Sequence, residues 1–406
     1  MPTSIRLRQL VPALALSSLG SSAAGAGVVN NVLLQWRAQA DKCEEPKQQD
    51  HMASVSVAMF DAVNAIGGRY VSYALKARAL PRSSMDAAAA SAAHGVLAAL
   101  CPDLKSGYDK ALKTSLDLVK DTIARNNGAA IGKQAAAAVL AARANSRSEG
   151  KDGVIPMAAA GVYVPTIRQV GQLFAQQTPW VMTRFDELRP PAPPSLTSAE
   201  WVRDYNEIKS LGAKKSTART EEQTDTGGFW GGQDVRIVLR QLVGLPGRDL
   251  VTDARFLALA EMAWVDSYVA MMDGKYAHNL WRPITAIRNG ARDGNDATVP
   301  DSAWEGLTST PWHPEYPCGH CLSAAAVGTV IDLEFGNKLP VIVLDPDSAM
   351  LRRYRTAREY IDEVGEARIY AGVHYRNSVD VGKAMGVSIG RLALQRYFKP
   401  AKRQRR

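Results

Sequence analysis

The chain has 406 residues, of which 46% are hydrophobic and 22% are charged, and its formal net charge is +9. A chain of this length and composition can bury one large core or two moderate ones, so we expect a globular protein. Aromatic residues are only 7% of the sequence while alanine-rich stretches recur, a balance that favours helix and disfavours an all-β fold. Beyond the N-terminal leader, no segment has the ~18 uninterrupted apolar residues that a membrane span needs.

The basic residues are spread along the chain except for one dense run, "KPAKRQRR", at residues 399–406. Such a tail is usually solvated, and a contact with nucleic acid is the alternative interpretation. Because the remaining cations are dispersed, we expect no nucleic-acid partner. A basic field of this kind can still steer small anions toward a site.

The N-terminal residues 1–26 have the pattern of a secretory signal peptide, with two arginines, a short apolar run and then small residues. A disordered apolar leader is the alternative. Export to the periplasm or the medium would let the four cysteines pair, most simply Cys43 with Cys101 and Cys318 with Cys321. Four free thiols are equally compatible with the sequence. The sequence is also compatible with a homo-oligomer.

Helical spacing of apolar residues dominates the first part of the chain. It predicts four or five helices over residues 28–40, 51–66, 92–124 with an interruption at Pro102, and 129–144. Residues 151–197 are rich in glycine and proline, which sustain neither a helix nor a central strand, so they are predicted to form a long irregular connection.

Helix signals resume after this connection. Thr197 or Ser198, followed by Glu200, predicts a helix start, and Gly212 predicts its end. Further helices are predicted over 253–281, 319–336 and 347–372, with no strand of convincing length. The expected fold is one mainly α domain, a helical bundle spanning residues 27–398.

Two cations in "DGKYAHNLWRPITAIR", Lys275 and Arg282, are seven residues apart, so on a continuous helix they face the same way. Pro283 disfavours unbroken helix at this point, which predicts that Arg282 sits at a helix end or a kink. Two charges on a solvated face are the alternative interpretation.

A second pair, Arg368 and His374 in "GEARIYAGVHYRNSVDVG", is six residues apart. On an ideal helix their side chains point about 120° from each other, so they converge only if the helix ends between them. Gly372 can supply that ending. A structural role for His374 is the alternative interpretation.

The third element is "HPEYPCGHCLSAAA", residues 313–326. Pro317 suits the first turn of a helix, which would leave the amides of Cys318 and Gly319 free to donate to an anion. His320 would stand beside that anion and exchange a proton. The same letters also allow a redox dithiol or a disulfide that staples the loop; dithiol catalysis would need a preceding strand in a βαβ pattern, which the sequence lacks.

The order Lys-x6-Arg-Pro, Pro-X-Gly-His and Arg-x5-His resembles the three-part signature of vanadium-dependent haloperoxidases and type 2 phosphatidic acid phosphatases. Segments such as "HMASVSVAMFDAVNAI", "DGKYAHNLWRPITAIR" and "HYRNSVDVGKAMG" are similar to the soluble bacterial haloperoxidases, and the resemblance covers nearly all of residues 28–398.

The resemblance implies a helical bundle that binds vanadate, with phosphate able to occupy the same site. His374 would ligate vanadium and His320 would act as the acid-base group. The oxyanion would be neutralised and held by the remaining signature residues, Lys275, Arg282, Arg368, Cys318 and Gly319. Hydrogen peroxide, a halide and a small organic acceptor would be the substrates. A histidine at position 313 resembles the bromide-using members, so bromide is expected to be favoured over chloride.

The pattern departs from the family at Ala367 and Cys318, where the family has serine. A thiol at position 318 would be exposed to oxidants, unless it is buried or paired with Cys321. The alternatives are a soluble exported acid phosphatase, in which His374 attacks phosphorus and His320 protonates the leaving oxygen, and an exported protein that binds the oxyanion without turnover.

Overall fold

The computed structural model describes residues 31–43, 49–146, 159–165, 172–344 and 351–401. The predicted signal peptide and the last residues of the basic tail lie outside these ranges. The prediction of a mainly α helical bundle is confirmed, since helices account for most of the described chain and the two strands are three residues each. Among the described residues, no helix combines the length and the hydrophobicity needed to cross a membrane.

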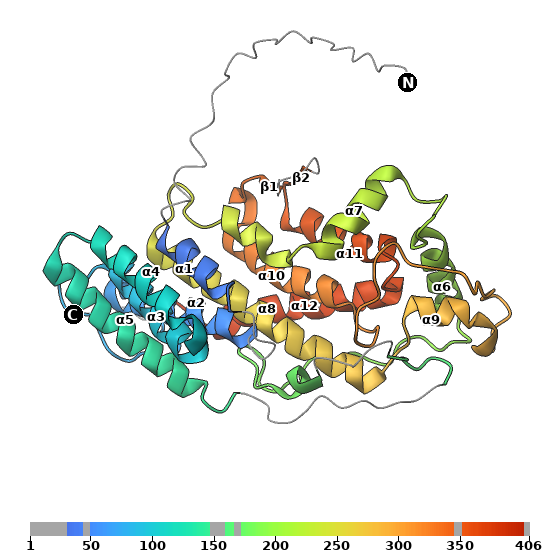
Figure 1. Cartoon of the computed structure of the whole chain (residues 1–406), viewed down its shortest axis with the longest axis horizontal. Helices are drawn as coiled ribbons and strands as arrows, with labels where there is room; N and C mark the ends of the chain where they lie inside the picture. The colour runs from blue at the N-terminus through green and yellow to red at the C-terminus, as the bar shows by residue number, and fades with distance from the viewer. Residues whose placement is uncertain (1–30, 44–48, 147–158, 166–171, 345–350, 402–406) are drawn as a thin grey trace, which may run out of the picture.

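The N-terminal part forms five helices at one end of the molecule (Figure 1). They are α1 (Val32–Ala40), α2 (Gln49–Gly67), α3 (Met85–Leu100), α4 (Lys105–Leu118) and α5 (Thr122–Ala142), with a short 3-10 turn, Pro102–Leu104, between α3 and α4. Side-chain caps begin several of them, as when Asp121 accepts from the first amides of α5. The 3-10 turn between α3 and α4 confirms the interruption predicted at Pro102.

The middle of the chain is irregular up to α6 where the structure describes it, apart from the 3-10 turn Gln172–Gln176. The helices that follow are α6 (Ala199–Leu211), α7 (Glu221–Gly232), α8 (Leu250–His278) and α9 (Pro283–Arg288), with 3-10 turns at Val235–Gln241 and Gly290–Arg292. Ser198 caps α6 and Gly212 ends it, as predicted. Sequence reasoning missed α7, whose four glycines conceal its helical character.

The C-terminal part contains α10 (Gly319–Phe335), α11 (Ala357–Tyr370) and α12 (Arg376–Arg396), together with the 3-10 turn Gly336–Lys338. Figure 1 shows α8, α10 and α12 running side by side through the middle of the molecule. The helix predicted over 347–372 is shorter than expected. Thr356 caps α11, and the residues before it form β2 (Arg352–Tyr354), which pairs antiparallel with β1 (Ile342–Leu344).

Two helix pairs make the most extensive contacts, α3 with α5 and α10 with α12. Both depend on glycines spaced four residues apart, which bring one helix onto the backbone of the other. A Cβ on Gly132 of α5 would lie 2.3 Å from the carbonyl oxygen of Ala88, and one on Gly386 of α12 would lie 2.2 Å from that of Leu322. One large hydrophobic core joins residues from α1 through α12.

The two disulfides have the pairing that the sequence made simplest. Cys43 is bonded to Cys101, which joins the end of α1 to the end of α3, and Cys318 is bonded to Cys321 at the start of α10. All four cysteines are therefore paired.

Candidate functional site

Lys275 lies in the last turn of α8, with its side chain fully buried. Its ammonium nitrogen Nζ donates to the carbonyls of Pro314, Glu315 and Pro317 at 2.6–2.9 Å. Burial and the neighbouring Arg282 lower the pKa of Lys275, whereas three carbonyl acceptors match the three N–H groups of the charged form. The lysine thus fixes the path of the loop before α10.

Arg282 reaches the same loop, but not because it shares a helix with Lys275. The chain leaves α8 at Asn279, which has a left-handed φ of 49°, and Arg282 is the extended residue before α9. The prediction of a helix end at Arg282 is confirmed, while the argument from a continuous helical face is wrong. Its guanidinium donates to the carbonyl of His313 at 2.9 Å and to that of Val373 at 2.8 Å.

The side chain of His313 is held by this arginine. Nδ1 of His313 lies 2.9 Å from Nη2 of Arg282 and 3.2 Å from the carbonyl oxygen of Pro314. The guanidinium can only donate and makes the shorter contact, so Nδ1 accepts and the ring is neutral. Burial and the charges of Lys275 and Arg282 lower the pKa of His313 well below its usual value, which agrees with this assignment.

The first helical residue of α10 is Gly319, with Cys318 as its N-cap. Pro317 therefore precedes the helix rather than lying in its first turn. The amide of Cys318 donates to the carbonyl of Ser378 at 3.1 Å, and its sulfur is bonded to Cys321. The prediction that Cys318 offers a donor to an anion is therefore wrong, because the N-cap amide points at α12 rather than along the axis of α10.

The amides of Gly319 and His320 occupy the first two positions of α10, where N–H groups have no partner inside the helix. Gly319 also lies tightly against α8, since a Cβ at this position would stand 2.1 Å from the sulfur of Met271. The positive end of the helix dipole and these two amides form the donor end of the site.

Arg368 is in the last turn of α11 and is almost fully buried. Its Nη1 donates to the carbonyl of Trp230 in α7 at 3.0 Å. Its Nε is buried and has no hydrogen-bond partner in the part of the chain that the structure describes. Burial and the charge of Arg282 lower the pKa of Arg368 to about 10, so the guanidinium stays charged near neutral pH.

His374 follows the end of α11, and Gly372 with a φ of 77° supplies the predicted break before it. The His374 imidazole is buried, with Nδ1 at 2.7 Å from the carboxylate oxygen Oε1 of Glu315 and Nε2 at 3.4 Å from Nη1 of Arg282. Burial and the charges of Arg282 and Lys275 hold the pKa of His374 well below its usual value. A neutral imidazole is therefore turned toward the cations.

His320 is the half-buried member of the cluster, and its ring makes no hydrogen bond within the described residues. Burial and the charge of Arg368 lower its pKa to about 3, so the ring is neutral before an anion arrives. A neutral imidazole accepts a proton at one nitrogen and donates at the other.

The charges of this cluster do not balance. Three buried cations, Lys275, Arg282 and Arg368, face a single buried carboxylate, that of Glu315. Buried charge without a partner is costly, and an anion would remove the excess. The orphaned Nε of Arg368 and the amides of Gly319 and His320 are donors suited to an oxyanion such as vanadate or phosphate, so the residues present fit that group.

Comparison with known proteins identifies the fold that carries this cluster. Residues 255–403, which contain most of the cluster, match the family model described as the VCPO second helical-bundle domain. A bacterial vanadium-dependent iodoperoxidase structure has a TM-score of 0.75 at 19% identity, over 93% of this chain and 98% of that one. The chain has the fold of the vanadium haloperoxidase family.

A bacterial vanadium-dependent chloroperoxidase is also similar. Its holo structure has a TM-score of 0.66 at 17% identity, over 93% of this chain and 94% of that one. Its apo structure has a TM-score of 0.68 at 17% identity, over 92% of this chain and 94% of that one. No curated protein matches the chain in a sequence search. The resemblance inferred from the three motifs is thereby confirmed, whereas the division into one domain over residues 27–398 stays a prediction.

Sequence reasoning missed one central residue of this haloperoxidase-fold cluster, Glu315. Its position inside "HPEYPCGH" was the available signal, because an acidic residue in a loop that faces several cations is a natural partner for one of them. Trp230 and Ser378 were also missed, and no sequence signal could reveal them because only their backbone carbonyls take part.

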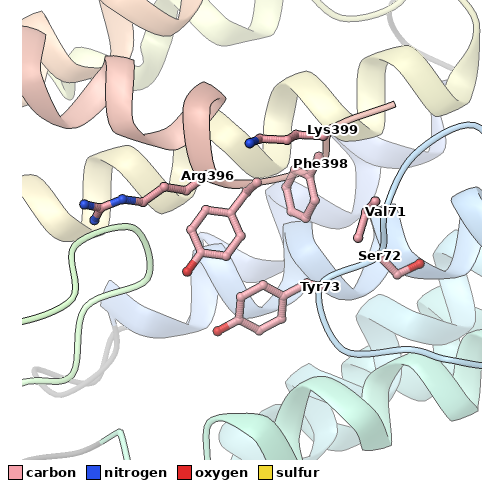
Figure 2. Close-up of a pocket in the computed structure, with 7 residues that line it drawn as sticks. Val71, Ser72, Tyr73, Arg396, Phe398 and Lys399 are labelled. Atoms are coloured by element: carbon pink, nitrogen blue, oxygen red, sulfur yellow. The ribbon is translucent and has the colours of Figure 1, made fainter. Parts of the chain in front are cut away.

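A separate cavity of about 230 Å³ lies between residues 71–73 and the end of α12 (Figure 2). Tyr73, Phe398 and Lys399 line it together with Arg396. The guanidinium of Arg396 is already paired with Glu187 at 2.9 Å. None of the predicted site residues lies there, so this cavity is not the candidate site.

Proposed function

We propose that the protein is a vanadate-dependent haloperoxidase that oxidises halide with hydrogen peroxide, with bromide favoured over chloride and a small organic molecule as the acceptor. The observation that carries the proposal is the excess of buried positive charge around the neutral imidazole of His374, beside the start of α10. The similar solved structures are titled iodoperoxidase and chloroperoxidase, which supports the same class of reaction.

The proposed roles follow from the geometry. His374 would hold vanadium through Nε2, the nitrogen not engaged by Glu315. Arg282, Arg368 and Lys275 would neutralise the oxygens, and the amides of Gly319 and His320 would donate to them. When bound, vanadate supplies Lewis-acid activation of hydrogen peroxide.

His320 would hold and move the proton. Its neutral ring lies at the half-buried edge of the cluster, where it can take a proton from an incoming peroxide and return it to a leaving oxygen. We expect His320→Ala to keep the bound anion and lose turnover, because the ring is not needed to hold the oxygens.

The Cys318–Cys321 disulfide is compatible with an oxidising reaction. The pairing leaves no thiolate to repel an oxyanion, and both sulfurs are buried. Burial also argues against disulfide exchange with another protein, the redox interpretation of the CGHC sequence. Because all four cysteines are paired, an oxidising compartment and hence export are part of the proposal.

A phosphatase that uses a phosphohistidine is the second candidate, since the same donors fit phosphate and the Nε2 lone pair of His374 can attack phosphorus. The deciding experiment measures oxidation of iodide, bromide and chloride by hydrogen peroxide, and hydrolysis of p-nitrophenyl phosphate, each with and without orthovanadate. We expect vanadate to switch on halide oxidation and to inhibit any hydrolysis. Hydrolysis without halide oxidation would favour the phosphatase, and neither activity would leave an anion-binding protein.

A further inference from the structure

Glu315 contacts all three parts of the site. Its carboxylate contacts His374, its carbonyl accepts from Nζ of Lys275 at 2.8 Å, and its amide donates to the carbonyl of Leu280 at 2.9 Å. It has no exposed surface. A residue that touches the segments around positions 278, 315 and 374 can fix their relative positions.

We propose that Glu315 is a positioning residue, which holds His374 in the tautomer with a proton on Nδ1 and thereby aims the bare Nε2 at the bound oxyanion. The inference rests on the proposed function, because it assigns the oxyanion to the Nε2 side of the ring. It concerns a residue that lies outside the three motifs and was not among the predicted site residues.

The tautomer follows from the contacts of a single oxygen. Oε1 of Glu315 accepts the backbone N–H of Tyr375 at 3.0 Å, and a backbone amide can only donate. Burial raises the pKa of Glu315 to about 7, while the charges of Arg282 and Lys275 favour its ionised form. The ionised carboxylate is oriented by the Tyr375 amide independently of the histidine, so Nδ1 at 2.7 Å donates to the same oxygen. In a neutral imidazole this leaves the lone pair on Nε2.

The other side of the ring supports the same assignment. Nε2 lies 3.4 Å from Nη1 of Arg282, a group that carries only N–H donors. A proton on Nε2 would face these donors directly, whereas a lone pair is attracted to them. Partners that hold the second nitrogen of a ligand histidine commonly contribute 10- to 100-fold in affinity, about the size of effect expected here.

The second carboxylate oxygen offers a way to test position separately from charge. Oε2 has no hydrogen-bond partner among the described residues. Glu315 lines a small cavity together with Ser378 and Tyr375, whose hydroxyls have no partner among these residues either. In Glu315→Gln the carbonyl oxygen can keep both bonds at the Oε1 position. The amide nitrogen then takes the place of Oε2 beside Ser378, whose hydroxyl oxygen can accept from it.

The two possible roles of Glu315, as a negative charge and as a positioning residue, predict opposite effects of Glu315→Ala on anion binding. If Glu315 mattered only as a negative charge, removing it would tighten anion binding equally in Glu315→Gln and Glu315→Ala. If it positions the ring, Glu315→Gln should bind orthovanadate and inorganic phosphate at least as tightly as the wild type, whereas Glu315→Ala should bind them about 10- to 100-fold more weakly.

The experiment is isothermal titration of the full chain and both variants with orthovanadate and with inorganic phosphate. Asp61→Asn is the matched control, because Asp61 is also a fully buried carboxylate that accepts backbone amides, those of Tyr73, Ala74 and Leu75, but lies in α2. The control should bind as the wild type does. Equal tightening in both Glu315 variants would overturn the positioning role, while absence of binding in the wild type would overturn the proposed function itself.

A second measurement determines the tautomer directly in the wild-type protein. The chain has six histidines, and ¹⁵N spectra of histidine-labelled wild-type protein without added anion would report the protonation of their ring nitrogens. The His374 signals would be assigned by their loss in His374→Gln. We expect a protonated Nδ1 and a bare Nε2 for this residue near neutral pH. A proton on Nε2 instead would overturn the inference.

Discussion

The α3–α5 and α10–α12 helix pairs use the same packing device for different ends. In both, glycines at every fourth residue bring one helix onto the carbonyl groups of the other, at Gly128 and Gly132 in α5 and at Gly382, Gly386 and Gly390 in α12. In the first pair the contact is made mainly by alanines and contributes to the core. In the second, Gly382 lies against the carbonyl of Cys318, so the close packing also sets the start of α10.

The two regions also differ in their treatment of charge. On α4 two pairs of oppositely charged side chains lie at the surface, Lys105 with Asp109 and Lys113 with Asp117. Beside α10 three cations are buried with one carboxylate. Ion pairs at the surface contribute little to stability. An uncompensated buried charge lowers the stability of the fold, and a bound anion would offset that loss. The two regions therefore share a packing geometry and differ in whether their charged groups are compensated.

The largest effect should follow from removing the site histidine. We expect His374→Ala to retain no vanadate after gel filtration and to lose halide oxidation by at least about a thousandfold, because the direct contact to vanadium would be gone. Elemental analysis and a halide-oxidation assay measure both. His94→Ala, in the N-terminal bundle where His94 contacts Asp109 at 2.7 Å, is the control and should keep both properties. Equal losses in the two variants would contradict the division between the regions.

Removing the two disulfides should separate stability from anion binding. The Cys43–Cys101 bond closes a loop with a sequence separation of 58, against 3 for Cys318–Cys321. Chain entropy then predicts that Cys43→Ala/Cys101→Ala lowers the free energy of unfolding by about 4 kcal/mol and Cys318→Ser/Cys321→Ala by about 2 kcal/mol.

Only the second double variant should weaken orthovanadate binding, because its bond lies at the amides of Gly319 and His320. Denaturant unfolding and titration measure the two properties. Loss of orthovanadate binding in a folded Cys43→Ala/Cys101→Ala variant would contradict this separation of stability from binding.

Alanine substitutions at Gly132 in α5 and Gly386 in α12 test the two helix pairs separately. A Cβ on Gly132 or on Gly386 meets a backbone oxygen at 2.3 or 2.2 Å, so either alanine variant should lose about 2 kcal/mol of unfolding free energy through overpacking. Gly386→Ala should in addition weaken orthovanadate binding as α10 shifts, whereas Gly132→Ala should not. Unchanged stability in both variants would show that the helix pairs can separate without cost.

The smallest effect concerns acid stability in the N-terminal region. His51 in α2 donates from Nε2 to the carbonyl of Ala40, and burial lowers its pKa from 6.5 to about 4. Because the unfolded chain binds the proton more readily, stability due to His51 is present above pH 6.5 and falls as the pH drops toward 4.

The wild type should therefore lose about 2 kcal/mol relative to His51→Gln between pH 8 and pH 5. Denaturant unfolding at a series of pH values gives this difference. A difference that does not change with pH would mean that His51 is as easily protonated in the folded protein as in the unfolded chain.

The sequence by itself determined most helices and most of the residues of the site. Apolar spacing located the N-terminal helices, α8 and α10, because burial of one face is recorded in local periodicity. The breaks near Arg282 and at Gly372 were readable because proline and glycine restrict or release the backbone at their own positions.

Only the tertiary structure decided how the motifs meet. Lys275 and Arg282 converge through the carbonyls of residues 313–317, the amide of Cys318 is used by Ser378, and Glu315 rather than a motif residue orients His374. These contacts join segments up to about sixty residues apart, and all except the one between Glu315 and His374 use backbone groups. Every residue has such groups, so the sequence carries no local signal for them.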